Sequence, residues 1–159
     1  MLFFHRWSLA MVAKSLNATV RFAEDDLFIG ISPSGHAITI DTGHERSVAT
    51  SPVELLLVAL GSCTAVDVVS ILRKKRQRII KYHVEVSGER REDHPRAYTS
   101  MKVHHVLTGV GLTSKAVAQA IELSESKYCS VAATLRPTVE IYSSFEIIED
   151  MQSLELGEQ

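Results

Sequence analysis

The stretch from Ser51 to Leu72 constrains the fold more than any other part of this 159-residue chain. From Leu55 onward nearly every residue is apolar or small, which predicts a helix buried on all sides rather than a half-exposed surface helix. Ser51, Pro52 and Glu54 predict where this helix begins, because they fit an N-cap, a first helical position and the third residue of a capping box. We expect the helix to lie at the centre of the fold and a second subunit to complete its cover.

Strand patterns surround this helix on both sides along the chain. The patterns before it cover residues 17–23, 27–32 and 36–41, and those after it cover residues 82–90, 98–107 and 137–148. Between the last two strands lie a helix capped by Thr113 and a shorter helical segment over residues 126–135. Runs of strands followed by a helix, twice over, predict an α+β fold with an antiparallel meander first and a hairpin later.

The composition is that of an ordinary globular protein, with 45% hydrophobic and 23% charged residues. We expect one domain over residues 13–150, an irregular extension over 1–12 and an acidic tail over 151–159. A formal net charge of −2 provides no long-range attraction for nucleic acid or an anionic membrane, so neither is expected as a partner. We see no apolar run long enough to span a bilayer and no clear signal peptide, which predicts a cytoplasmic protein.

Cys63 and Cys129 are the only thiols of the chain, and each lies in or at the mouth of a helical pattern. Their separation far exceeds the spacing of a zinc knuckle, so the fold must bring them together if they act together. We expect no metal site and no bound cofactor. Asp67, one helical turn after Cys63, would oppose a thiolate there. Cys129 is better placed for reactivity, because a helix N-terminus and Lys127 nearby would favour its anion. The alternative is that either cysteine is a small buried hydrophobe.

Three segments together resemble the OsmC/Ohr family of osmotically inducible and organic-hydroperoxide-resistance proteins, and within it the YhfA-like branch. They are residues 34–41 (SGHAITID), 51–69 (SPVELLLVALGSCTAVDVV) and 124–132 (SESKYCSVA), and the resemblance runs from about Ala18 to Ile148. It implies an intertwined homodimer of α+β subunits, in which antiparallel sheets pack around two central helices that carry the cysteines. It also implies a site at the subunit interface.

The resemblance further implies a thiol-dependent peroxidase acting on organic hydroperoxides. By position, Cys63 matches the peroxidatic cysteine and Cys129 the resolving one. The implied cycle forms a sulfenic acid at Cys63 and then a disulfide, which an external dithiol such as a lipoylated protein reduces.

The chain departs from the peroxidase pattern at three places. The family's glutamate ten positions before the reactive cysteine is replaced by Val53, and Glu54 is either a displaced counterpart or only the helix cap. The thiolate-stabilising arginine has no match in its usual loop, so Arg21 and Arg46 are candidates by proximity in sequence. Ser130 follows Cys129 where the peroxidases carry proline.

Two classes of function follow. The first is the thiol peroxidase. The second is a non-enzymatic dimeric binding or redox-sensing protein with an apolar pocket at the interface, in which the cysteines are packing or sensor residues.

Overall fold

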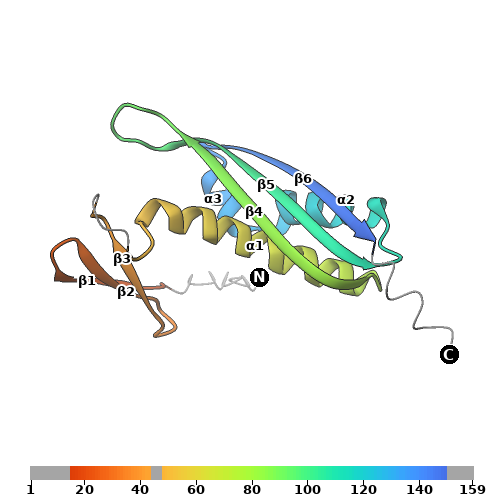
Figure 1. The fold of residues 1–159 in the computed structure, drawn as a ribbon, viewed down its shortest axis with the longest axis horizontal. Helices are drawn as coiled ribbons and strands as arrows, with labels where there is room; N and C mark the ends of the chain where they lie inside the picture. Colours follow the sequence, from red (N-terminus) through yellow and green to blue (C-terminus); the bar gives the residue numbers. More distant parts are fainter. Residues whose placement is uncertain (1–14, 44–47, 150–159) are drawn as a thin grey trace, which may run out of the picture. The chain divides into compact units, whose positions relative to one another are not determined.

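The computed structural model describes residues 15–43 and 48–149, which form two compact units (Figure 1). The first unit ends at Pro52 and the second begins at Val53. The extension expected over residues 1–12 and the tail expected over 151–159 lie outside the described residues. The single domain over residues 13–150 stays a prediction.

The N-terminal unit contains a three-stranded meander, as its alternating pattern predicts. The strands are β1 (Thr19–Glu24), β2 (Leu27–Ile31) and β3 (Ala37–Asp41), paired antiparallel in the order β1-β2-β3. Asp41 is buried, and its carboxylate accepts hydrogen bonds from the backbone N–H groups of Gly43 (2.8 Å) and Val48 (3.0 Å). This carboxylate therefore fixes the start and the end of the loop that leaves the meander.

The second unit is built on a sheet of three long strands in the order β4-β5-β6. They are β4 (Arg78–Arg90), β5 (Tyr98–Val110) and β6 (Glu140–Glu149). The β4–β5 hairpin is confirmed as antiparallel, whereas β6 pairs with β5 in parallel, so the expectation of purely antiparallel sheets is wrong for this unit. The reason is the long helical connection between β5 and β6, which returns the chain to the end of the sheet where β5 began.

Helices cover one face of this sheet (Figure 1). They are α1 (Pro52–Lys74), α2 (Ser114–Leu123), the π-helical turn η1 (Ser124–Tyr128) and α3 (Ser130–Leu135). The cap at Thr113 is confirmed, because its side chain accepts a hydrogen bond from the backbone N–H of Ala116 at 3.2 Å. The helical segment expected over residues 126–135 is in fact the end of the π-helical turn followed by α3.

The core lies between α1, the connecting helices and the inner face of β5. Alternate residues of β5 point inward, and Val103 and Leu107 pack in two separate hydrophobic clusters, one with Leu60 and one with Val68. Between these clusters His105 is completely buried. The core is therefore apolar at both ends of α1 and polar near its middle.

Burial of α1 is one-sided within the subunit, so the expected burial on all sides, completed by a second subunit, stays a prediction. Its fully buried residues recur every three or four positions, whereas Val58 and Val66 on another side are 61% and 69% exposed. The helix also meets the length and hydropathy criteria for crossing a membrane, contrary to our expectation for apolar runs, with a mean hydropathy of 2.2. Core helices of soluble proteins meet the same criteria, and α1 packs on the sheet.

Candidate functional site

The fold brings the two cysteines together although they are distant in sequence. Cys63 lies in the middle of α1, and Cys129 is the residue directly before α3. Their sulfur atoms and a carboxylate oxygen of Asp67 all lie within 4.8 Å of one another. Both thiols are free, Cys129 being buried and Cys63 half-buried. We call Cys63, Asp67 and Cys129 the thiol–carboxylate cluster.

Local backbone geometry accounts for each position in this cluster. Cys63 and Asp67 are four residues apart on α1 and therefore share one helical face. Cys129 follows the π-helical turn, and its backbone N–H donates to the carbonyl of Ser124, five residues earlier, at 2.8 Å. The sulfur of Cys129 then accepts a hydrogen bond from the backbone N–H of Ala132 at 3.3 Å, so the thiol itself caps α3.

Ser124 holds the carboxylate of the cluster in place. This completely buried serine lies with its Oγ 2.9 Å from Oδ2 of Asp67 and 3.1 Å from Oγ1 of Thr64, within hydrogen-bond distance of both. We did not predict this role from the sequence. The sequence does contain a signal for it. Ser124 follows Val117 and Ala120 at the three- and four-residue spacing of a buried helix face, so a hydroxyl is expected to point into the core there.

Electrostatics at the cluster oppose the anion of Cys129. Burial, its hydrogen bond with Cys63 and the charge of that neighbour raise the pKa of Cys129 to about 11, although the backbone N–H groups of Ala132 and Val131 act in the opposite direction. None of these causes is a basic side chain. Lys127, which we expected to favour the thiolate, instead places its ammonium 5.5 Å from the ring centre of Tyr128. Burial and the neighbouring thiol therefore outweigh the backbone N–H groups in their effect on the pKa of Cys129, and the reactivity that we expected for this cysteine stays a prediction.

The remaining candidates lie away from the cluster or outside the described residues. Glu54 is exposed and nine residues before Cys63, a separation that turns α1 by about two and a half turns and places it on the opposite side. The charge of Glu54 acts on Tyr98 instead. Burial raises the pKa of Tyr98, Arg90 lowers it, and Glu54 raises it by a smaller amount. Arg21 is an exposed residue of β1 in the N-terminal unit, and Arg46 lies outside the described residues.

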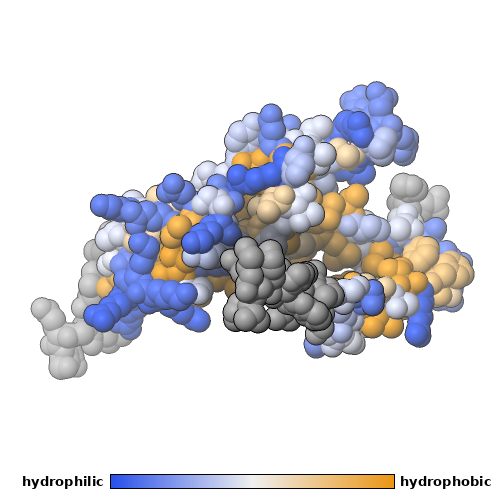
Figure 2. Space-filling model, turned by 180° about the vertical axis from the view of Figure 1, so that it is seen from behind, coloured by the Kyte–Doolittle hydropathy of each residue, from blue (hydrophilic) through white to orange (hydrophobic). Residues whose placement is uncertain are grey.

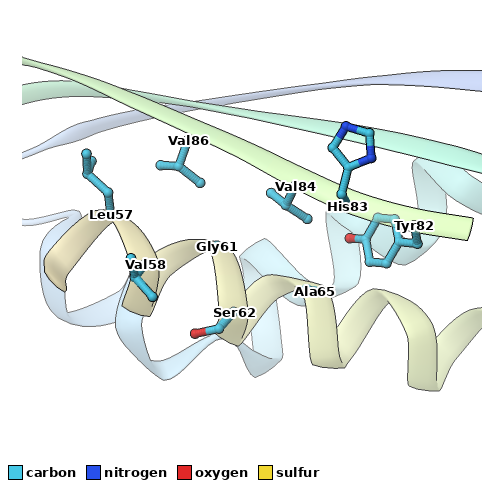
Figure 3. A pocket seen from close by; sticks show the side chains of 9 residues that line it. All are labelled: Leu57, Val58, Gly61, Ser62, Ala65, Tyr82, His83, Val84 and Val86. Atoms are coloured by element: carbon cyan, nitrogen blue, oxygen red, sulfur yellow. The ribbon is translucent and has the colours of Figure 1, made fainter. Parts of the chain in front are cut away.

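An open groove of about 380 Å³ runs between α1 and β4 (Figure 3). It is lined by Leu57, Val58, Gly61, Ser62, Ala65, Tyr82, His83, Val84 and Val86. The close approach of helix and strand depends on Gly61, where a Cβ atom would lie 2.9 Å from Cγ2 of Val86. Most of the lining is apolar, so the groove suits a hydrocarbon group better than a charged ligand.

Comparisons with known proteins agree with this architecture. A model of the family described as OsmC-like protein matches residues 43–144. Protein YhfA from Escherichia coli is 44% identical over 133 residues, which cover 84% of this chain and 98% of that protein. A hypothetical protein from Aquifex aeolicus has a crystal structure with 33% identity and a TM-score of 0.77, covering 86% of this chain and 98% of its own.

A more distant structure has a descriptive name. It is an organic hydroperoxide resistance protein from Legionella pneumophila, with a TM-score of 0.65 over 85% of this chain and 98% of its own. At 11% identity it shows a shared fold and no more. The family model and the 44% identity over most of both chains establish that this chain belongs to the OsmC-like protein family.

Proposed function

We propose that this protein is a thiol-dependent peroxidase that reduces organic hydroperoxides through Cys63 and Cys129. One observation carries the proposal: the only two thiols of the chain meet at the centre of the second unit, with their sulfurs within 4.8 Å.

The proposed cycle balances with an external dithiol as reductant. The thiolate of Cys63 attacks the O–O bond of the hydroperoxide, which yields a sulfenic acid at Cys63 and an alkoxide that takes up a proton to leave as the alcohol. The thiol of Cys129 then attacks the sulfenic sulfur, which forms the disulfide and releases water. A dithiol of the kind found on a lipoylated protein reduces the disulfide and restores both thiols.

Accessibility supports this order of events. Cys63 is half-buried and Cys129 is 3% exposed, so a peroxide from solvent reaches Cys63 first. The pKa of about 11 for Cys129 also fits a thiol that reacts second, on an already activated sulfenic sulfur. The apolar groove between α1 and β4 suits the alkyl part of an organic hydroperoxide by its lining, although neither cysteine is among its lining residues. The name of the Legionella relative points to the same substrate class.

The thiol–carboxylate cluster contains a carboxylate and no basic side chain, so the proposed cycle calls for a cation from outside it. Arg21 and Arg46 remain the proposed sources of this charge. Glu54, by contrast, is better explained by its place in the first turn of α1.

We further propose that the protein works as a homodimer in the cytoplasm. The exposed side of α1, with Val58 and Val66, is an apolar surface of the kind that a second subunit covers. A second copy also supplies a second set of arginines.

Titration of free thiols tests the proposed function directly. One equivalent of cumene hydroperoxide added to the reduced protein is expected to consume two alkylatable thiols per chain. A catalytic amount of enzyme with dihydrolipoamide should then sustain alcohol formation. Retention of both thiols after this treatment would contradict the peroxidase.

The second candidate is a dimeric binding or redox-sensing protein of the same fold. Two observations favour it. The pKa of Cys129 is raised to about 11, which disfavours a reactive thiolate there, and Val53 stands in place of the glutamate of the peroxidase pattern. The same titration separates the two functions: a sensor loses its thiols to peroxide but does not turn over with a dithiol, and a binding protein loses none.

A further inference from the structure

We propose that the thiol–carboxylate cluster binds a thiophilic divalent cation, with Zn²⁺ as the best fit, when both cysteines are reduced. This site goes beyond the proposed peroxidase and does not depend on it. The residues concerned are Cys63, Asp67 and Cys129, which present two sulfurs and one oxygen toward one another.

Ligand type and spacing both fit zinc. Zn²⁺ takes cysteine sulfur at about 2.3 Å and carboxylate oxygen at about 2.0–2.2 Å in tetrahedral sites, so its ligand atoms lie roughly 3.5–3.8 Å apart. The three ligand atoms here are all within 4.8 Å, so closure on the ion requires shifts of about 1 Å or less. Cys63 and Asp67 supply two ligands from one helical face, the i and i+4 spacing that helical metal sites use.

The surroundings of the cluster resemble those of metal ligands. Ligating carboxylates are usually oriented by a further hydrogen bond, and the buried hydroxyl of Ser124 lies 2.9 Å from Oδ2 of Asp67. Coordinating cysteines are bound as thiolates, and the backbone N–H of Ala132 already points at the sulfur of Cys129. Three protein ligands leave a fourth position, and the half-buried side chains of Cys63 and Asp67 leave it accessible to water.

Charge balance at the cluster also fits a divalent cation, because two sulfur ligands and one carboxylate meet there. Binding replaces the protons of both thiols by the metal, so each Zn²⁺ taken up releases two protons. The product carries two thiolates, one carboxylate and one divalent ion, with a net charge of −1.

Metal binding and the disulfide are mutually exclusive states of the same sulfurs. A disulfide brings the sulfur atoms to about 2.05 Å and removes both thiolates, so the oxidised protein has no site. Occupancy by Zn²⁺ therefore protects the thiols from peroxide, and oxidation releases the ion.

Cobalt substitution under anaerobic conditions tests the site without reference to enzyme activity. Co²⁺ added to the reduced, chelator-treated protein is expected to give thiolate-to-cobalt charge-transfer absorption and the visible bands of a tetrahedral site. Zn²⁺ should bleach these bands at one ion per chain, with two protons released. Absence of the charge-transfer absorption, or its persistence in the protein oxidised to the disulfide, would overturn the proposal.

Variants locate the ion. Cys63→Ser and Cys129→Ser should each abolish the charge-transfer signature of a two-thiolate site, and Asp67→Asn should weaken binding. Ser124→Ala should lower the affinity by roughly 10–100-fold through loss of the carboxylate's partner. Ser126→Ala is the matched control, because this serine lies in the same π-helical turn but its hydroxyl donates to the carbonyl of Glu122 and not to the cluster.

Two further measurements distinguish loss of metal binding from loss of folding and from loss of peroxidase activity. A circular dichroism melt shows that each variant is folded, and equal affinity of wild type, Asp67→Asn and Ser124→Ala would contradict the site. Peroxide consumption is measured with a chelator present. Failure of the peroxidase then leaves the metal result intact, and failure of metal binding leaves the peroxidase intact.

Discussion

The hydroxyl of Tyr82 lies 2.7 Å from Nδ1 of His105, and the two rings are stacked with an interplanar angle of 4°. His105 is completely buried between the two hydrophobic clusters, and its Nε2 has no hydrogen-bond partner among the described residues. Burial, with a smaller contribution from His104, lowers the pKa of His105 to about 4. The core thus contains a neutral imidazole that cannot take up a proton without loss of stability.

We predict that this histidine makes stability fall as the pH falls from about 6.5 to about 4. Over that interval the unfolded chain, with an ordinary histidine pKa of about 6.5, binds the proton that the folded chain does not. The contribution lost from His105 alone by pH 4 is on the order of 3 kcal/mol. Urea unfolding across this pH range measures it.

His105→Gln should be less stable at neutral pH, because the packing with Tyr82 changes, but its stability should fall less between pH 6.5 and 4. His83→Gln is the control, since this histidine is largely exposed and its removal should leave the slope unchanged. An unchanged slope in His105→Gln would assign the pH dependence to other groups.

The two thiols should have separable roles. We expect Cys63→Ser to abolish peroxide consumption, whereas Cys129→Ser should permit one turnover and leave a sulfenic acid at Cys63 that a dimedone probe traps. Mass spectrometry measures the adduct, and further oxidation to the sulfinic acid should be easier in Cys129→Ser. Wild-type rates in both variants would exclude the two cysteines from catalysis.

The exposed side of α1 should be the dimer interface. Val66→Glu places a charge at a position that is 69% exposed in the subunit, and we expect it to shift a homodimer toward monomer in sedimentation velocity at micromolar concentration. Tyr142→Glu is the control, because Tyr142 is also exposed but lies on β6. A wild-type protein that is a stable monomer would contradict the assembly.

Hydrophobic residues also reach the surface elsewhere, as Figure 2 shows for the rear face. Val20 and Phe22 of β1 are 62% and 65% exposed, so both units carry apolar surface. Dissociation by Val66→Glu but not by Val20→Glu would assign the main contact to α1.

The contact between α1 and β4 should tolerate no added methyl group at Gly61. Gly61→Ala places a Cβ atom 2.9 Å from Cγ2 of Val86, so the helix or the strand must shift, at a cost of about 1–3 kcal/mol. Chemical denaturation measures this change. Ser62→Ala, at the exposed neighbouring position, should change stability by no more than about 0.5 kcal/mol.

Local signals in the sequence were sufficient for most elements. The start of α1 at Pro52, the Thr113 cap and the alternation in β4 and β5 are confirmed, because each depends on residues close together in the chain. Strand ends differ by a few residues, for example Arg78 rather than Tyr82 at the start of β4. Those ends are fixed by pairing with β5, which local sequence does not specify.

The features that depend on the whole fold were not predictable in this way. The parallel pairing of β6 follows from the path of the helical connection, and the one-sided burial of α1 follows from how much of it one subunit covers. The electrostatics of Cys129 depend on its burial and on the approach of Cys63, which no sequence pattern encodes. Ser124 gained its role only through contact with Asp67 on another helix.

The π-helical turn sets the angle at which the second thiol meets the first. An i to i−5 hydrogen bond accommodates one residue more than an α-helical turn does, and each residue corresponds to about 100° of rotation about the axis. If the same residues wound as a regular α-helix, Cys129 would be rotated by about 100° about the helix axis and carried away from Cys63. The meeting of the two sulfurs therefore depends on the count of residues in this turn as much as on their identity.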